Sequence, residues 1–205
     1  MSELLKVLKE RLGEHRVRSE RRASDYIDLL IIDLETTVPV TVVMTHGLSD
    51  YKMPVPDTMK GKDHTEIFFA LPSYWEPEDH QNQNMTWPFE KISKLAENLI
   101  EKGTWYGRGH TFSNGNPSLP LSSTMKMNHL MLAEPIALEQ FFRPIELEDK
   151  IVHFLAIIPL FEEEFDRKMQ QGYKKFIRKF RSANGDEILD DFRQSVLKSR
   201  WRIWG

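Results

Sequence analysis

The chain has 205 residues, of which 40% are hydrophobic and 11% aromatic, and its formal net charge is −3. This length and composition predict a globular domain with its own core and exclude a disordered or fibrous protein. The absence of cysteine excludes disulfides, thiolate zinc sites and thiol catalysis. The small net charge provides no overall field that would attract nucleic acid.

The N-terminal segment shows no signal for export or membrane insertion. Its sequence, MSELLKVLKERLGEHRVRSERR, is charged and amphipathic and lacks the continuous apolar stretch of a secretory signal peptide. Apolar runs such as residues 29–32 are far too short to span a bilayer. We therefore expect a cytoplasmic protein that does not enter a membrane.

Helical and strand patterns alternate in the first half of the chain. Residues 2–22 carry leucines at spacings of three and four, which predicts an amphipathic helix, and we assign residues 1–24 to an N-terminal helical segment. Residues 27–34, 38–45 and 65–71 are rich in branched and aromatic residues and predict three strands. The clearest helix is expected to begin at Pro88 and to end before Gly103.

The second half of the chain predicts two strands and three helices. Residues 125–132 and 151–158 form the strands, and the latter is apolar on both faces, which favours a central position. Helices are expected from near Leu160, from Tyr173 and from Gly185. Their inward residues would be Phe161, Phe165 and Met169, then Tyr173, Phe176, Ile177 and Phe180, and finally Leu189, Phe192 and Val196.

The order of these elements predicts an α+β fold, with strands early and helices late. We expect a mixed, mostly antiparallel sheet of about five or six strands, flanked by helices. The core domain is placed at residues 25–181. Residues 182–205 would form a C-terminal helix and a tail containing Trp201, Ile203 and Trp204, packed on the domain.

Two stretches place a histidine beside a glycine, His46–Gly47 and Gly109–His110. If His46, His64 and His110 converged with Asp50 or Asp63, they would suit a metal- or histidine-dependent hydrolase. No two histidines have the helical spacing of a zinc hydrolase. We therefore expect His46 and His110 to bond backbone groups at loops.

Other catalytic patterns also fail. The sequence GLSDY, residues 47–51, has tyrosine where a nucleophile elbow requires its second glycine. The sequence Gly107-Arg108-Gly109 lacks the lysine and hydroxyl residue of a phosphate-binding loop. The acids Glu162 to Glu164 at a helix start are explained by the helix dipole. We expect no catalytic residues, no metal and no cofactor, and keep the hydrolase as an alternative.

The basic helix is the one candidate for nucleic-acid binding, with Lys174, Lys175, Arg178, Lys179 and Arg181. The two aromatic residues between these cations, Phe176 and Phe180, fall on the inward face at helical spacing. Stacking on bases would require them to be exposed. We therefore expect no nucleic-acid partner.

Four motifs in order resemble the suppressor-of-fused domain family. They are GLSDYKMPVP, TEIFFALPSYW, TWPFEKISKLAENLIEKGTWYGRGHTF and HFLAIIPLFEEEFDRKMQQGYKKFI, and the resemblance covers residues 27–180. It implies an α/β domain with a mixed sheet flanked by helices and without a known catalytic residue set or metal. Animal members bind a transcription factor in Hedgehog signalling and have a second, C-terminal domain. This chain is too short to hold that domain, so we do not transfer the Hedgehog role.

The resemblance also implies roles for the two histidine–glycine loops. They correspond to family loops that shape the fold and its binding edge, and their residues here are Gly47, Leu48, Ser49 and Asp50, and Gly109, His110 and Thr111. In animal members the first loop lies near the ligand, which makes Asp50 and Tyr51 contact candidates.

Stand-alone members of this family are typical of bacteria and are thought to act as immunity proteins, or antitoxins, that neutralise toxins by binding them. We expect the partner to be a toxin whose active site is covered by exposed loops. Candidate contacts are Asp50, Tyr51, Tyr74 and Trp75, with Trp105 a further aromatic that we expect to be more buried than Trp75. If the toxin is a nuclease, Glu146, Glu148 and Asp149 would mimic phosphates. The alternative is a peptide-binding adaptor that adds a ligand strand to a sheet edge.

Overall fold

The computed structural model describes residues 2–13, 16–22, 27–76, 79 and 81–198. Its helices are α1 (Glu3–Leu12), α2 (Gln83–Glu101), α3 (Glu162–Gln171) and α4 (Tyr173–Ser182), with short 3₁₀ turns η2 (Leu48–Asp50) and η3 (Asp57–Met59). Its strands are β1 (Val17–Arg22), β2 (Asp28–Leu34), β3 (Val40–His46), β4 (His64–Pro72), β5 (Thr111–Ser113), β6 (His129–Ala133), β7 (Ile145–Glu146) and β8 (Ile151–Leu160). Within these residues no helix has the length and apolar character needed to cross a bilayer.

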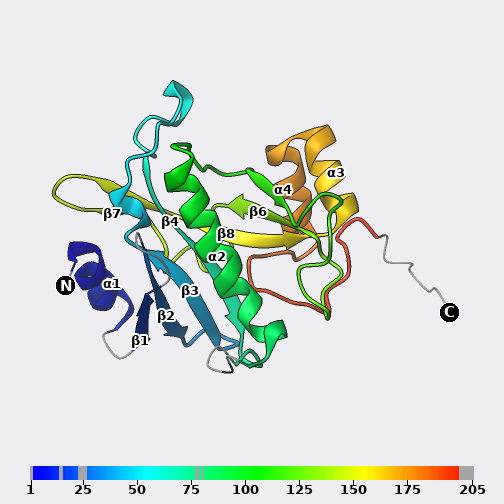
Figure 1. Ribbon diagram of the computed structural model, residues 1–205, viewed down its shortest axis with the longest axis horizontal. Coiled ribbons are helices and arrows are strands. Elements are labelled where there is room, and N and C mark those ends of the chain that lie inside the picture. The colour runs from blue at the N-terminus through cyan, green and yellow to red at the C-terminus, as the bar shows by residue number, and fades with distance from the viewer. Residues whose placement is uncertain (1, 14–15, 23–26, 77–78, 80, 199–205) are drawn as a thin grey trace.

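All the strands join one mixed sheet. The order is β1-β2-β3-β4-β8-β6-β5, and β7 pairs separately with β8. The pair β4–β8 is parallel and the other described pairs are antiparallel. In Figure 1 α2 crosses the front of the sheet, while α1 and the α3–α4 pair lie at opposite sides. The predicted α+β class, the mostly antiparallel sheet and the central place of β8 are confirmed.

The described residues form eight strands of this sheet, more than we predicted. The additional strands are β1, β5 and β7. The last two have three and two residues, too short to produce a recognisable alternation. The strand β1 has the sequence VRSERR, and its many charged residues give no strand pattern although it pairs with β2.

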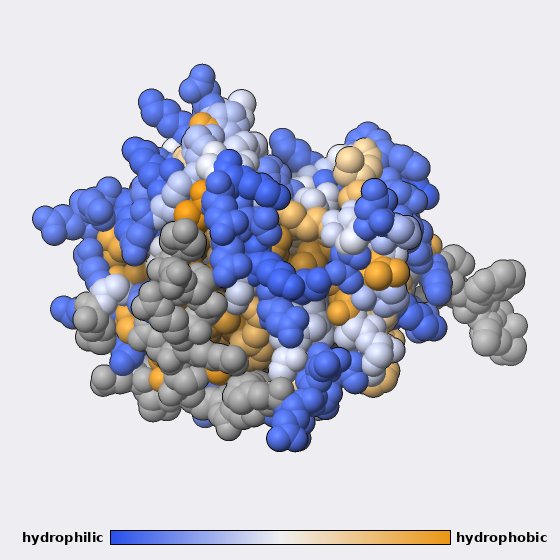
Figure 2. All heavy atoms as spheres, viewed as in Figure 1, coloured by the Kyte–Doolittle hydropathy of each residue, from blue (hydrophilic) through white to orange (hydrophobic). Residues whose placement is uncertain are grey.

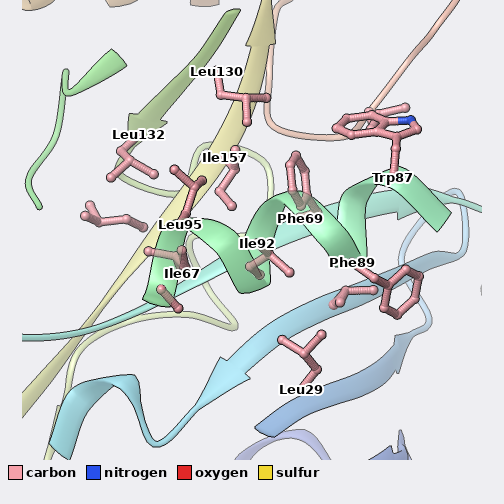
Figure 3. Packing of buried hydrophobic residues seen from close by; sticks show 14 of the residues in the cluster. Leu29, Ile67, Phe69, Trp87, Phe89, Ile92, Leu95, Leu130, Leu132 and Ile157 are labelled. Atoms are coloured by element: carbon pink, nitrogen blue, oxygen red, sulfur yellow. The ribbon is translucent and has the colours of Figure 1, made fainter. Parts of the chain in front are cut away.

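The largest core cluster lies between α2 and one face of the sheet. Successive side chains of a strand point to opposite faces, so Leu155 and Ile157 of β8 reach this cluster whereas Phe154 does not. Figure 3 shows side chains of α2 facing those of the strands, among them Ile92, Phe69 and Ile157. Each fully buried side chain of this kind contributes about 1.5–3 kcal/mol.

The opposite face of the sheet is covered by three segments. Leucines of α1 and residues 138–147 pack on β2, β3, β4 and β8. Phe176 and Phe180 of α4 are fully buried against β6 and β8, as their spacing predicted. The two phenylalanines are therefore core residues and are not available for stacking on bases.

The N-terminal helix is shorter than predicted. It ends at Leu12 because Gly13 turns the backbone to a φ of 95° while its N–H bonds the carbonyl of Lys9. Residues 17–22 then pair with β2, so the expectation of helix up to residue 22 was wrong.

Helix α2 begins before the predicted position. Asn82 caps it by accepting a hydrogen bond from the backbone N–H of Asn84, and Pro88 lies within the helix. Proline is unfavourable inside a helix, and the burial of Pro88 with its neighbours Trp87 and Phe89 compensates for it here. The predicted end before Gly103 is confirmed.

The segment after Gly185 is irregular, so the predicted last helix was wrong. The side chains of Asp186 and Asp190 accept hydrogen bonds from the N–H groups two residues further on, a local turn that competes with helix formation. Leu189 is buried as expected, but Phe192 is 76% exposed. Met169 of α3 is also exposed, against prediction. The docking predicted for Trp201, Ile203 and Trp204 lies outside the described residues.

Candidate functional site

The loop after β3 is held by a buried carboxylate. Oε1 of Glu66 accepts hydrogen bonds from the backbone N–H groups of Gly47 (3.2 Å) and Ser49 (3.0 Å), and its Oε2 accepts one from the hydroxyl of Thr45. Gly47 has a φ of 101°, which favours glycine, and Leu48 is buried beneath the turn. The loop residues Gly47 to Ser49 are therefore fixed by the fold.

Glu66 is a titratable group completely enclosed in the sheet. Glu66 is 0% exposed, and this burial raises the pKa of its carboxyl group. Hydrogen bonds from Thr45 and Ser49 lower the pKa and so oppose that rise. His64 adds a bond between its Nδ1 and the carbonyl of Ser49, at 2.8 Å. All these polar groups are engaged in holding the loop.

The second loop, residues 103–112, is built around aromatic rings. The rings of Trp105 and His110 lie 4.3 Å apart, and the hydroxyl of Tyr106 donates to the carbonyl of Leu95 in α2. Gly109 has a φ of 85° and lies against Tyr173, where an added Cβ would come within 2.9 Å of the ring side chain. The glycine therefore permits both the turn and the close approach to α4.

The two loops contact each other. The hydroxyl of Tyr51 donates to the carbonyl of Thr104 (3.4 Å), and the N–H of Tyr106 points to the sulfur of Met53 (3.3 Å). Spacing in the sequence does not reveal that these two loops, about fifty residues apart in the chain, form one surface.

A cleft of about 460 Å³ opens between α2 and the second loop. Its lining is partly apolar and aromatic and includes Trp105, His110 and Phe112. It also includes Lys91 and Lys94 of α2 and Lys102, which follows that helix, but no carboxylate of the described residues. Figure 2 shows apolar residues at the centre of this face between hydrophilic ones. The size is typical of a cavity that accepts a ligand or an anchoring side chain.

An acidic end of the molecule adjoins the first loop. Asp50, Glu146, Glu148 and Asp149 are exposed there, and Lys150 joins the two segments through an ion pair with Asp50. Gly47, Asp50 and Asp149 also line one small cavity of about 100 Å³. The structure therefore brings the candidate acids together at one end of the sheet.

The predicted aromatic contacts differ in their exposure. Tyr74 is 46% exposed and donates a hydrogen bond to Asp191, whereas Trp75 is 4% exposed and its indole N–H bonds the carbonyl of Met85. Trp75 is thus a core residue. Trp105 is only partly buried and lines the cleft, so the expected order of burial between these tryptophans was wrong.

The histidines of the hydrolase alternative do not converge. His46 bonds Ser2, His64 bonds the carbonyl of Ser49, and the ring of His110 lies against that of Trp105 in a tilted arrangement. Among the described residues no three His, Asp or Glu side chains are arranged to hold a metal ion. His153, in β8, bonds the carbonyl of Gly61.

Burial of histidines predicts that stability depends on pH. Burial lowers the pKa of His110, His129 and His153 below 6.5, so the unfolded state binds more protons than the folded state near that pH. The free energy of unfolding should therefore fall as the pH drops from about 7.5 to about 5.5, as measured by urea denaturation.

The variant His129→Gln should show a shallower dependence than the wild type. Glu66 and Asp186, whose carboxyl pKa values are raised by burial, titrate in both proteins, so the comparison isolates the histidine. A stability that is constant or rises on acidification, with the same slope in the variant, would contradict the assignment.

Sequence reasoning missed three buried glutamates that hold loops. Besides Glu66, Glu187 accepts bonds from the N–H groups of residues 136–138, and Glu164 pairs with Arg193. For Glu66 a signal existed, because it is the one charged residue in the apolar segment TEIFFAL. For the other two, the partners are too distant in the chain to be inferred.

Comparison with known proteins identifies the fold. A family model described as Suppressor of fused protein (SUFU) matches residues 23–194. The Sufu chain of a Sufu–Fu complex superposes with a TM-score of 0.70 and 14% identity, covering 94% of this chain and 90% of that chain. A SUFU homolog from Neisseria gonorrhoeae FA 1090 gives 0.66 and 15%, covering 95% and 96%.

Drosophila Suppressor of Fused also superposes, with a TM-score of 0.67 and 16% identity. The match covers 94% of this chain but 50% of that protein, so the chain spans half its length. A search of curated proteins found no match. The family model covers most of the sequence and the fold agrees with these structures, so the chain belongs to the Suppressor of fused (SUFU) protein family.

Proposed function

We propose that this protein is a non-catalytic protein-binding domain, and that it acts as a bacterial immunity protein that neutralises a toxin by direct binding. The observation that carries the binding role is the joined surface of the two motif loops. It runs from exposed Asp50 through Tyr51 and Thr104 to the cleft beside Trp105. Membership in a family represented by a complex between two proteins supports a protein partner.

The polar groups of these loops support binding over catalysis. Glu66, His64 and the hydroxyl of Tyr106 are engaged with backbone or hydroxyl groups of the protein itself. A general acid or base must reach a substrate proton. Glu66, His64 and Tyr106 instead use their polar groups to hold the loops in place.

The surface has two parts that suit different partner groups. The cleft would receive an apolar or aromatic side chain against Trp105, since buried aromatic anchors dominate the binding energy of many interfaces. The acidic end would face cations of the partner, which fits a toxin whose own substrate is anionic. Covering the toxin's active site would then block it without chemistry.

Two variants test the two parts of this surface. Trp105→Ala is expected to weaken binding to the neutralised partner at least about tenfold, as for a central anchor. Combined alanine replacement of Glu146, Glu148 and Asp149 should slow association and make it less dependent on salt. Affinity is measured by titration calorimetry and association rates by surface plasmon resonance.

Control variants of the same chemical type lie elsewhere on the surface. Val38→Ala changes an exposed apolar residue just before the start of β3, whereas the first loop follows the end of that strand. Glu163→Ala with Asp166→Ala removes two exposed acids from α3. These should leave binding unchanged. Unchanged affinity and rates in both test variants would remove this surface as the binding site.

A further inference from the structure

A second groove lies on the side of the sheet opposite α2. It has a volume of about 520 Å³ and runs between α4 and residues 134–144. Its floor includes Phe154 of β8, which faces away from the α2 cluster. The groove is therefore separate from the cleft beside Trp105.

Positive charge dominates the lining of this groove. Five cations line it, Lys62, Arg108, Arg143, Lys174 and Arg181, against two carboxylates, Glu134 and Glu139. Glu134 is already paired with both Arg108 (2.9 Å) and Lys62 (3.4 Å).

The other three cations, Arg143, Lys174 and Arg181, are exposed and make no ion pair with a carboxylate of the described residues.

A further cation, Arg11, lies next to the groove. Arg11 of α1 donates to the carbonyls of Arg143 and Pro144, and its pKa is lowered by burial and by the positive charge of Arg143. The two positive charges repel each other, so an anion bound near both would be stabilised. Among the described residues, no carboxylate forms an ion pair with either arginine.

Apolar groups lie between the cations. Ile136, Tyr173 and Ile177 are partly buried along the groove, with Pro135 beside them. Phe142 and Phe154 pack beneath, with ring centroids 5.6 Å apart. A ligand that combined negative charge with an apolar group would match this lining.

The cations are also spread along the groove. Lys174 and Arg181 are seven residues apart on α4, which corresponds to about 10 Å along the helix axis. A single phosphate cannot reach both, whereas an extended peptide covers that length with three or four residues. We propose that this groove binds an extended acidic peptide segment of a partner protein, with an apolar side chain between its carboxylates.

Fluorescence anisotropy at physiological salt would test the proposal on the full chain. The probe is a short labelled peptide with glutamates on both sides of one leucine. Replacing Arg143 and Arg181 together with alanine should weaken its binding about tenfold or more, since two charge-assisted contacts are lost. Changing the peptide's leucine to alanine should weaken binding to the wild type as well.

The matched control is Arg178→Ala with Lys179→Ala, which removes the same charge from exposed positions of α4 outside the groove. This pair should change affinity by less than about threefold. Equal losses in both pairs, or no binding of the peptide, would overturn the proposal. Stronger binding of single-stranded oligothymidine, weakened by the groove pair, would assign the groove to phosphates instead.

The groove proposal and the proposed toxin-binding surface can be contradicted independently of each other. Trp105→Ala should leave affinity for the acidic peptide unchanged, because Trp105 does not line the groove. If it weakened peptide binding as much as the groove pair, the peptide would occupy the cleft and the groove assignment would be wrong.

Discussion

Replacing Glu66 with alanine should lower the free energy of unfolding by about 3–5 kcal/mol, which corresponds to a melting temperature lower by about 10 °C. The carboxylate accepts hydrogen bonds from Gly47, Ser49 and Thr45, and its removal leaves these donors without their acceptor in an enclosed site. A cavity would add to the cost. Urea denaturation followed by circular dichroism measures the difference.

Glu66→Gln is the matched control. Its amide oxygen keeps the acceptor for Gly47 and Ser49, and its NH₂ group can donate to the hydroxyl of Thr45, which then turns toward the carbonyl of Ile67. We expect this variant to lose less than half as much stability as the alanine variant. Equal losses would mean that volume and not hydrogen bonding makes Glu66 important.

Arg193→Ala is expected to cost about 3–5 kcal/mol, because it leaves a buried carboxylate without its counter-charge. Glu164 is 0% exposed, and Arg193 donates to its Oε1 at 2.8 Å and its Oε2 at 2.7 Å. The guanidinium also donates to the carbonyl of Pro159 and lies 4.8 Å from the ring centre of Phe161. Thermal and urea unfolding both report the loss.

The second partner provides the check on this pair. Adding Glu164→Gln to Arg193→Ala removes the unpaired charge, so the double variant should be more stable than Arg193→Ala alone. The amide keeps an acceptor for only one of the two N–H groups, those of Phe161 and Val196, so recovery should be partial. A double variant less stable than Arg193→Ala would show that the charge pairing is not what the site requires.

The sequence predicted the parts of the fold that depend on local patterns. The strands β2, β3, β4, β6 and β8 follow from runs of apolar, branched and aromatic residues, and the inward face of α4 follows from helical spacing. The strand β1 was missed because long-range pairing with β2 overrides its charged composition. The helix expected after Gly185 fails because Asp186 and Asp190 form local turns.

The candidate site was predictable only in part. The resemblance led to Asp50 and Tyr51, and the structure places Asp50 at the acidic end and Tyr51 against Thr104 of the second loop. Their proximity to Thr104 and Trp105 depends on sheet topology, which spacing in the sequence does not reveal. Trp75 was misjudged because an aromatic residue beside a loop gives no signal of whether it faces inward.

The central claim, that this protein neutralises a toxin by binding it, is tested most directly by affinity capture from its native cells followed by a toxicity assay. We predict one stoichiometric protein partner, which kills cells when expressed alone and is harmless when this protein is co-expressed. Rescue by wild type but not by Trp105→Ala would connect that protection to the cleft. A captured partner without toxicity, or toxicity that this protein does not relieve, would contradict the account.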